Sequence, residues 1–137
     1  MSKPRVRGVK GLDKALEQLA TFDQKAGRRV IVAALRAGNK VILDAAKEAI
    51  PVDSGALKAG MRQRARTRRG VPRNIIGFLP AVGWRWRFPE FGTQHMAAQP
   101  FMRPAVDTKS DAAGKVVTDA AWKAIQREAK RAASRAR

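Results

Sequence analysis

The chain has 137 residues, of which 45% are apolar, so a single domain with a modest core is expected and compositional disorder is excluded. Its 29 lysines and arginines against 11 acidic residues leave a formal charge of +18, which indicates a partner surface or polyanion that compensates part of it. The absence of cysteine excludes a disulfide framework and a thiolate metal site, and a single histidine, His95, argues against zinc.

The sequence predicts neither an N-terminal signal peptide nor a transmembrane segment. The N-terminal sequence MSKPRVRGVKGL is basic, but no apolar segment follows it as in a signal peptide. The longest apolar runs, such as VIVAAL at 30–35, are too short to cross a bilayer. We therefore expect one domain over residues 1–137, made in the cytosol, with basic ends at 1–9 and 127–137 that fray.

Two helices are predicted in the N-terminal third. Residues 11–22 place four apolar side chains on one face of a short amphipathic helix: Leu12, Leu16, Leu19 and Phe22. Residues 24–50 form the strongest helical segment, because apolar or small residues recur at alternating spacings of four and three: Ile31, Leu35, Gly38, Ile42, Ala45 and Ala49. Lys40 and Asp44 form an i,i+4 pair on the opposite, charged side, and Pro51 ends the helix.

The segment PVDSGAL, residues 51–57, predicts a turn in which Asp53 or Ser54 caps a helical turn over 56–60, with a simple loop as the alternative. In the following stretch, MRQRARTRR, arginine occupies every second position: Arg62, Arg64, Arg66 and Arg68. This period of two is typical of a β-strand with one basic face, whereas the same arginines would scatter around a helix. The turn signal at 69–73 and the sequence NIIGFL predict an antiparallel partner strand at 74–79.

Beyond this hairpin, AVGWRWRF at 81–88 alternates aromatic residues with arginines, which predicts a third strand with one aromatic and one cationic face. Residues 89–105 contain three prolines and a glycine and are expected to form an ordered loop. A helix is predicted from Asp107 to Arg137, with an apolar side made of Val117, Ala121, Trp122, Ile125, Ala129 and Ala132. The predicted fold class is α+β, with N-terminal helices including one long helix, a small antiparallel β-sheet and a C-terminal helix.

The sequence contains no catalytic constellation. Between Ser54 and Val106 the only acidic residue is Glu90, among ten lysines and arginines, whereas general acid–base catalysis normally needs two placed ionisable groups. Ser54 lies 41 positions before the single histidine, and no Gly-rich phosphate loop is present. We therefore expect a protein that is not an enzyme, with Glu90 paired to an arginine within the chain or across a subunit boundary.

Nucleic-acid binding is the alternative function. The arginine row at 62–68, together with Arg85 and Arg87 beside two tryptophans, is similar to a basic and aromatic surface for single strands. The aromatic face of the predicted third strand carries no arginine, however, which is typical of a strand that faces a core. No helix-turn-helix, RNA-recognition or zinc-finger pattern is present, so non-specific phosphate contact is favoured over specific recognition.

Three short motifs follow one another in the middle of the chain, with predicted helices on both sides. They are Pro51, Val52, Asp53, Ser54, Gly55 and Leu57; then Glu90, Phe91, Gly92 and Thr93; then Pro100, Phe101, Arg103, Pro104 and Ala105. In this order they resemble the tail-completion or neck family of long-tailed bacteriophages, typified by the gene-ten product of a lambdoid coliphage. Two departures are Pro89, where the family usually has an apolar residue, and the high density of arginine.

The resemblance implies a small α+β virion protein of the neck or upper tail that uses no cofactor and has no membrane partner. It would assemble as a homo-oligomeric ring, expected to be hexameric, and contact head-closure or connector proteins and tail-tube or tail-terminator proteins. Tail-completing and tail-terminating roles both remain open. The row Arg62, Arg64, Arg66 and Arg68 is interpreted first as a structural strand face toward an acidic neighbour, and second as a contact with packaged DNA in the channel.

The resemblance also implies a role for the last two motifs as a stiff elbow. Gly92 would permit a tight turn, Phe91 and Phe101 would anchor the elbow, and Pro100 and Pro104 would stiffen it. Such an elbow suits an interface between ring subunits and an intramolecular brace equally, because interface cores and domain cores are both rich in aromatic residues.

Overall fold

The computed structural model describes residues 12–52 and 55–137, so the basic segment 1–9 and the proposed caps Asp53 and Ser54 lie outside the described residues. The helices are α1 (Leu12–Leu19), α2 (Gln24–Ala49), α3 (Ala56–Gly60), α4 (Pro80–Gly83), α5 (Arg87–Phe91) and α6 (Met102–Arg135). The strands are β1 (Met61–Arg68) and β2 (Val71–Phe78). The predicted α+β class, with a long helix, an antiparallel sheet and a C-terminal helix, is confirmed.

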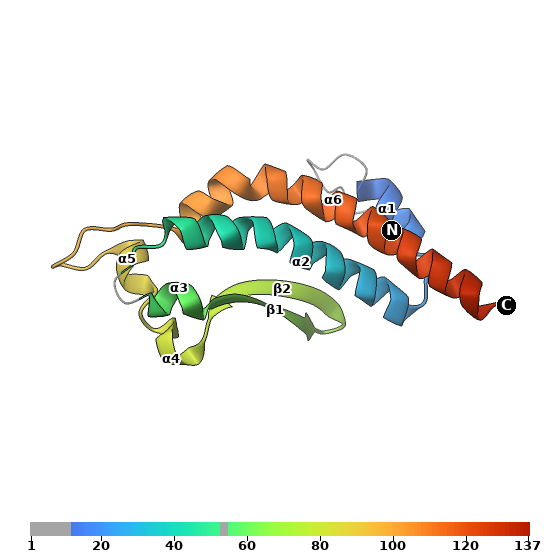
Figure 1. Ribbon diagram of the computed structural model, residues 1–137, viewed down its shortest axis with the longest axis horizontal. Helices are drawn as coiled ribbons and strands as arrows, with labels where there is room; N and C mark the ends of the chain where they lie inside the picture. The colour runs from blue at the N-terminus through green and yellow to red at the C-terminus, as the bar shows by residue number, and fades with distance from the viewer. Residues whose placement is uncertain (1–11, 53–54) are drawn as a thin grey trace.

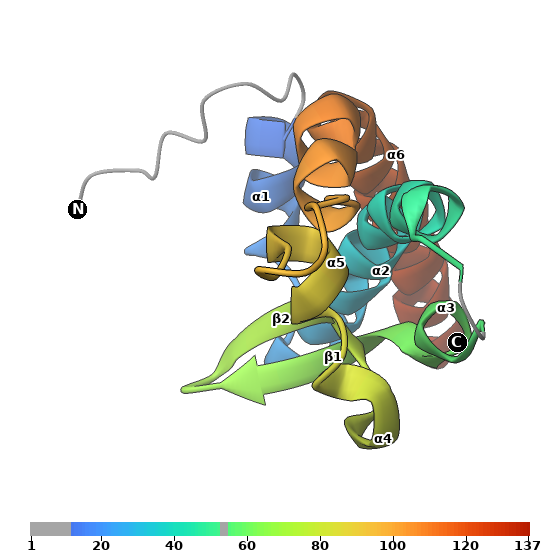
Figure 2. The same ribbon diagram turned by 90° about the vertical axis from the view of Figure 1, so that its left-hand side faces the viewer.

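The elements form three layers in an elongated molecule (Figure 1). Helices α2 and α6 run antiparallel, α1 lies beside the C-terminal half of α6, and the hairpin of β1 and β2 lies under α2, on the side away from α6 (Figures 1 and 2). The short helices α3, α4 and α5 gather at one end of the molecule, and the C-terminus of α6 lies at the other. The long helices therefore separate this end from the basic C-terminal segment.

Helix α2 begins where its sequence supplies a cap and ends before proline. The Asp23 side chain accepts a hydrogen bond of 2.7 Å from the backbone N–H of Ala26. The helix buries six residues: Ala26, Val30, Ala34, Gly38, Leu43 and Ala46. Most of the predicted apolar stripe is instead half-buried, because α2 contacts α6 on one side and the hairpin on the other and divides its apolar surface between them.

The apolar core consists of two clusters. One joins α1, α2 and α6 and contains Ala15, Val30, Ala34, Ala121, Ala124 and Ile125. The other lies where the end of α2, the start of β1 and the start of α6 meet, and contains Leu43, Ala46, Ile50, Met61, Phe101 and Ala105. The predicted apolar side of α6 stops early, since Ala129 and Ala132 are exposed.

An ion-pair network joins α2 to α6 next to the first cluster. Arg29 donates from Nε and Nη2 to the two carboxylate oxygens of Glu128, at 3.0 and 2.8 Å, and Arg131 donates to the same carboxylate at 3.0 Å. The hydrogen bond from Arg29 is the main reason that the pKa of Glu128 lies below its usual value. On the far side of α2, the predicted pair of Lys40 and Asp44 is confirmed at 2.8 Å.

The predicted third strand is wrong. After β2, the backbone N–H of Leu79 bonds the carbonyl of Gly60 at 2.8 Å, and Pro80, which has no N–H to extend a ladder, begins α4. Helix α5 follows over 87–91, and α6 begins at Met102 rather than at Asp107, so the predicted loop is shorter at both ends. The aromatic residues at 84–88 therefore lie on turns and short helices, not on one strand face.

The hairpin turn is tighter than predicted. Only Arg69 and Gly70 lie between the strands, both with positive φ, at 50° and 76°. A two-residue turn with both φ values positive matches the right-handed twist of the flanking strands. Val71 to Arg73 consequently belong to β2, which puts Arg73 opposite Arg66.

The crossing of α2 over α6 yields a stability prediction. A Cβ on Gly38 would collide with the side chain of Val117 and lie 3.1 Å from the Ala113 carbonyl oxygen, which belongs to the α6 backbone. We expect Gly38→Ala to lower the free energy of unfolding by about 1–2 kcal/mol, because overpacking costs more than the gain in helix propensity. Urea denaturation followed by circular dichroism measures this change.

Gly27 provides the matched control on the same helix. Its added Cβ would meet only the Leu19 carbonyl oxygen, at 4.0 Å, so Gly27→Ala should stabilise the protein by about 0.5–1 kcal/mol. Val117→Ala in the Gly38→Ala background should recover part of the loss. Equal effects at the two glycines would show that the helices do not approach closely at Gly38.

Candidate interface surfaces

The second and third motifs meet through the carboxylate of Glu90, which lies on α5 and is only 7% exposed. It accepts hydrogen bonds from the backbone N–H groups of Phe101, Met102 and Arg103 at 2.9, 3.0 and 3.0 Å. These are orphan donors at the start of α6, where a negative charge is also favoured by the helix dipole. Glu90 thus caps a helix that begins 11 to 13 residues later in the chain.

This arrangement corrects the expectation that Glu90 pairs with an arginine. Burial pushes the pKa of Glu90 upward, but the three backbone hydrogen bonds and the nearby charge of Arg103 outweigh it and hold the pKa below its usual value. The carboxylate is therefore ionised at neutral pH. Its hydrogen bonds are made with backbone amides, and Arg103 contributes attraction through its charge.

The loop between α5 and α6 is closed by its own backbone. Gly92 has φ of 72°, as the resemblance implies for a tight turn, and a Cβ there would lie 2.9 Å from the Ala98 nitrogen. The Thr93 N–H bonds the Met96 carbonyl at 2.9 Å, and the Gln99 N–H bonds the Pro89 carbonyl at 2.7 Å. The loop is thus braced against α5 although most of its side chains are exposed.

The two phenylalanines of the elbow have opposite environments. Phe101 is fully buried in the second core cluster, with its ring edge toward Phe78 at 6.2 Å between centroids. Phe91 is 64% exposed and touches only one other ring, that of Trp86, at 5.8 Å. Phe101 therefore serves as an intramolecular brace, and Phe91 points away from the core.

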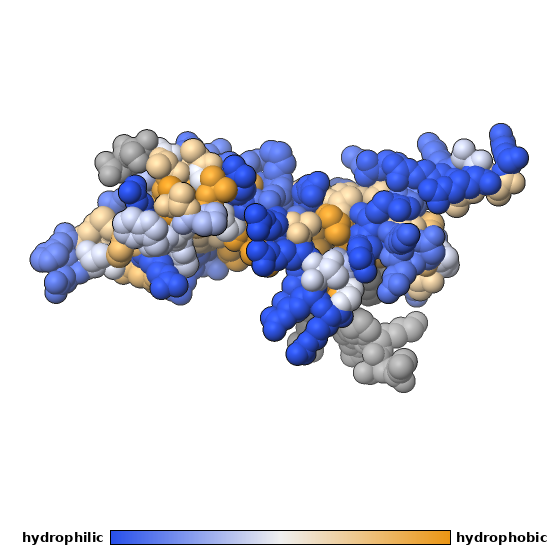
Figure 3. Space-filling view, turned by 90° about the horizontal axis from the view of Figure 1, so that it is seen from below, coloured by the Kyte–Doolittle hydropathy of each residue, from blue (hydrophilic) through white to orange (hydrophobic). Residues whose placement is uncertain are grey.

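An exposed groove of about 440 Å³ lies at the same end of the molecule, and we call it the aromatic groove. Its apolar lining comes from the first motif, the segment after α4 and the loop between α5 and α6: Pro51, Leu57, Trp84, Phe88, Pro89 and Met96. Trp84 and Phe88 pack edge to face at 5.9 Å and are 60% and 44% exposed. Apolar side chains mix with polar ones at this end in Figure 3. Large exposed aromatic side chains gathered in one groove are a common feature of interaction sites.

The aromatic groove also carries positive charge and a special backbone position. Lys58 and Arg85 line it, and the Arg85 guanidinium lies 5.0 Å from the centre of the Trp84 ring. Gly55, the residue before α3, has φ of 78°, which a residue with a Cβ rarely adopts. The first motif therefore shapes the groove through Pro51, Gly55 and Leu57.

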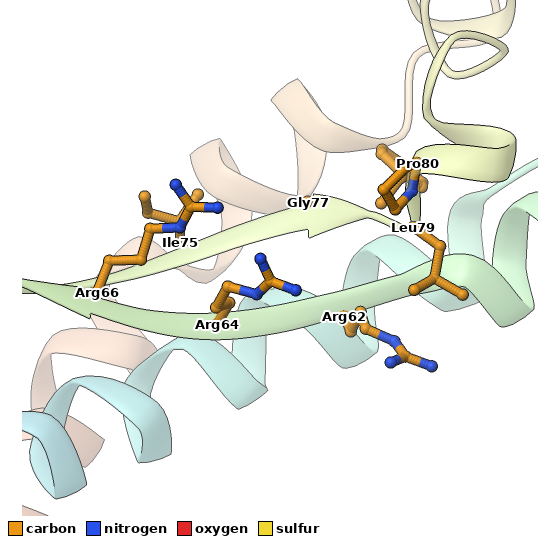
Figure 4. Close-up of a pocket in the computed structure, with 8 residues that line it drawn as sticks. Arg62, Arg64, Arg66, Ile75, Gly77, Leu79 and Pro80 are labelled. Atoms are coloured by element: carbon orange, nitrogen blue, oxygen red, sulfur yellow. The ribbon is translucent and has the colours of Figure 1, made fainter.

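The basic row of β1 lies on the outer face of the hairpin, away from α2. Arg62, Arg64, Arg66 and Arg68 are all exposed, whereas Met61 on the inner face is fully buried. Arg62, Arg64 and Arg66 line a shallow trough of about 350 Å³, together with Ile75, Gly77, Leu79 and Pro80 (Figure 4). The predicted alternation of β1 is confirmed.

Sequence reasoning missed the aromatic groove because it assigned Trp84 and Phe88 to a strand facing the core. The i,i+4 spacing of these two residues, between Pro80 and Pro89, was the available signal for helical turns. The remaining motif residues Thr93, Pro100, Arg103 and Pro104 are exposed around the elbow.

Other kinds of site find no support in the part of the chain that the structure describes. No group of His, Asp or Glu side chains within 12–52 and 55–137 could hold a metal ion. His95 is exposed, and its backbone N–H donates to the Thr93 hydroxyl at 3.2 Å. Among the described helices, none is both long enough and apolar enough to cross a bilayer.

Comparison with known proteins gives one match. The model of a family described as "Bacteriophage HK97-gp10, putative tail-component" matches residues 12–92, more than half of the 137-residue chain. No curated protein and no solved structure matches it. The matched range runs from α1 through α5 and includes the first motif, the second motif up to Gly92, the whole hairpin and most of the aromatic groove.

Proposed function

Because the chain belongs to the HK97 gp10-like family of phage tail components, we propose that it is a tail-completion or head–tail joining subunit of the virion neck. In this role it forms a homo-oligomeric ring between the head connector and the tail tube. Its partners are further copies of itself and the neighbouring connector, tail-tube or tail-terminator proteins. Its mechanism is assembly through complementary surfaces, without catalysis.

The observation that carries this proposal is the aromatic groove at one end of an elongated molecule. Trp84, Phe88 and Met96 are 60%, 44% and 41% exposed, which is unfavourable in water unless another surface covers them. In a closed ring each subunit has two different patches: one binds the next copy, and the other binds the previous copy. We assign the groove to the contact with the adjacent copy, because all of its lining residues except Met96 lie inside the family match.

Light scattering of the purified chain, at physiological and at high salt, tests self-assembly. We expect a discrete oligomer that survives high salt, because apolar contacts are not screened by ions. The variant Trp84→Ser with Phe88→Ser should be monomeric, whereas Val106→Ser, which alters an exposed apolar residue on α6, should keep the oligomer. A monomer for the unaltered chain at every concentration would contradict the ring, and an intact oligomer in the groove variant would exclude the groove.

The outer face of the hairpin favours a second candidate, a free basic protein that binds nucleic acid non-specifically. This function predicts DNA binding with a steep salt dependence and no defined ring. Within the neck, the same face would meet either an acidic neighbouring protein or the DNA in the channel. An acidic protein and DNA would be recognised by the arginines in different ways.

A further inference from the structure

The hairpin carries an uncompensated positive charge. From Met61 to Phe78 the sequence contains six arginines and no acidic residue. Within 12–52 and 55–137, the ion pairs join other residues, and the guanidinium groups of the hairpin have no hydrogen-bond or ion-pair partner. Arg66 and Arg73 are directly opposite in the register, an arrangement of like charges that destabilises a strand pair. Repulsion among these arginines therefore destabilises the isolated chain, and a bound anion would remove this repulsion.

The arginines form a regular row. Alternate residues of a strand are about 6.7 Å apart, so Arg62 to Arg68 extend over roughly 20 Å. Figure 4 shows Arg62, Arg64 and Arg66 one after another along β1, and Ile75 is the register partner of Arg64. Opposite Arg62 stands Gly77, where an added Cβ would meet nothing within 4 Å. The trough is thus open above Gly77, so that an anion can approach the backbone.

We propose that the outer face of the hairpin binds the backbone of double-stranded DNA, through phosphate contacts made by Arg62, Arg64, Arg66, Arg68 and Arg73. Arginine recognises phosphate well because its planar guanidinium donates two parallel hydrogen bonds. A length of about 20 Å equals the axial rise of about six base pairs of duplex, so the row is long enough to meet several phosphates. Only the placement of this face toward the neck channel rests on the proposed function.

The composition of the face favours DNA over an acidic protein. Its exposed residues are arginines with the aliphatic Val71 and Ile75, and it lacks the acidic side chains that would fix one orientation of a protein partner. A phosphate backbone needs no fixed register, because its charges repeat uniformly. Single-stranded nucleic acid fits less well, since its bases require aromatic platforms, and Trp84 and Phe88 lie in the groove rather than on this face.

Fluorescence anisotropy with the full chain and a labelled duplex of mixed sequence, over a series of salt concentrations, tests the proposal. The test variant is Arg62→Gln with Arg64→Gln and Arg66→Gln. The matched control is Arg127→Gln with Lys130→Gln and Arg135→Gln, which removes equal charge from exposed positions of α6. We expect the hairpin variant to lose on the order of 100-fold in affinity at 0.1 M salt, and its slope of log K against log salt to become shallower by about 2.7. The control should change affinity only several-fold.

Three results would overturn the proposal. Equal losses in the two variants would mean that overall charge, not this face, attracts DNA. Failure of the unaltered chain to bind duplex would leave an acidic protein as the occupant. Tighter binding of single-stranded than of double-stranded DNA would show that duplex is not the preferred partner. Thermal melting of both variants, in which no loss of stability is expected because the altered residues are exposed, separates these outcomes from misfolding.

The same variants distinguish this inference from the proposed function. Light scattering of the hairpin variant should show the oligomer of the unaltered chain, since the aromatic groove is intact. Loss of DNA binding with an unchanged oligomer supports the inference. Duplex binding through the hairpin by a chain that never forms a ring would also support it, while contradicting the ring.

Discussion

Phe101→Ala is expected to lower the free energy of unfolding by about 3–5 kcal/mol, the range for deleting a buried aromatic ring. Phe101 is fully buried, and its cluster joins the end of α2, the start of β1 and the start of α6. The cavity left by the ring would lie at the junction of three elements, so little collapse can fill it. Urea denaturation followed by circular dichroism measures the loss.

Phe91→Ala is the matched control, because Phe91 belongs to the same elbow but is 64% exposed. We expect its unfolding free energy to stay within about 0.5 kcal/mol of the unaltered chain. The pair of variants separates the two roles left open for the elbow, since Phe101 would act through folding and Phe91 only through a partner. A large loss of stability in Phe91→Ala, or a negligible one in Phe101→Ala, would contradict this division.

Glu90→Ala is expected to destabilise the protein by about 2–3 kcal/mol at neutral pH, because it leaves buried backbone N–H groups at the start of α6 without a hydrogen-bond acceptor. The carboxylate accepts from three consecutive N–H groups, and the N-cap residue Phe101 makes no side-chain cap hydrogen bond of its own. Glu90→Gln should lose less at neutral pH, since its amide oxygen still accepts. Glu48→Gln, at an exposed glutamate near the end of α2, should have little effect.

The contribution of Glu90 should also depend on pH. Its pKa is lower in the folded chain than the ordinary value of 4.5, so the unfolded chain binds the proton more tightly. The stabilisation is therefore fully present above the ordinary pKa and is lost as the pH falls through the lower folded pKa. Unfolding free energies of the unaltered chain and Glu90→Gln, measured from neutral pH downward, should converge in acid. A constant difference across that range would show that the charge of Glu90 does not stabilise the cap.

Some elements were predictable because their signal is contained within a few consecutive residues. The apolar spacing and the proline after Ile50 predicted α2, and the alternating arginines define β1 and its outer face. The prediction of a third strand was wrong because the alternation of aromatic residues and arginines at 84–88 is also compatible with short helical turns. The chain forms helical turns here because Pro80 cannot extend the strand ladder and because Leu79 donates a hydrogen bond to Gly60, a residue distant in sequence.

Like the fold, the candidate site has some features that the sequence predicts and others that only the tertiary structure decides. Sequence spacing is enough to define the basic row and the three motifs, and the lone carboxylate among cations marks Glu90 as a residue that needs a partner. Its actual partners depend on where α6 begins relative to α5, and the contrasting burial of Phe91 and Phe101 depends on how the elbow lies against the core. Contacts between segments far apart in the chain set these features, because spacing specifies which face of an element is apolar but not which other element covers it.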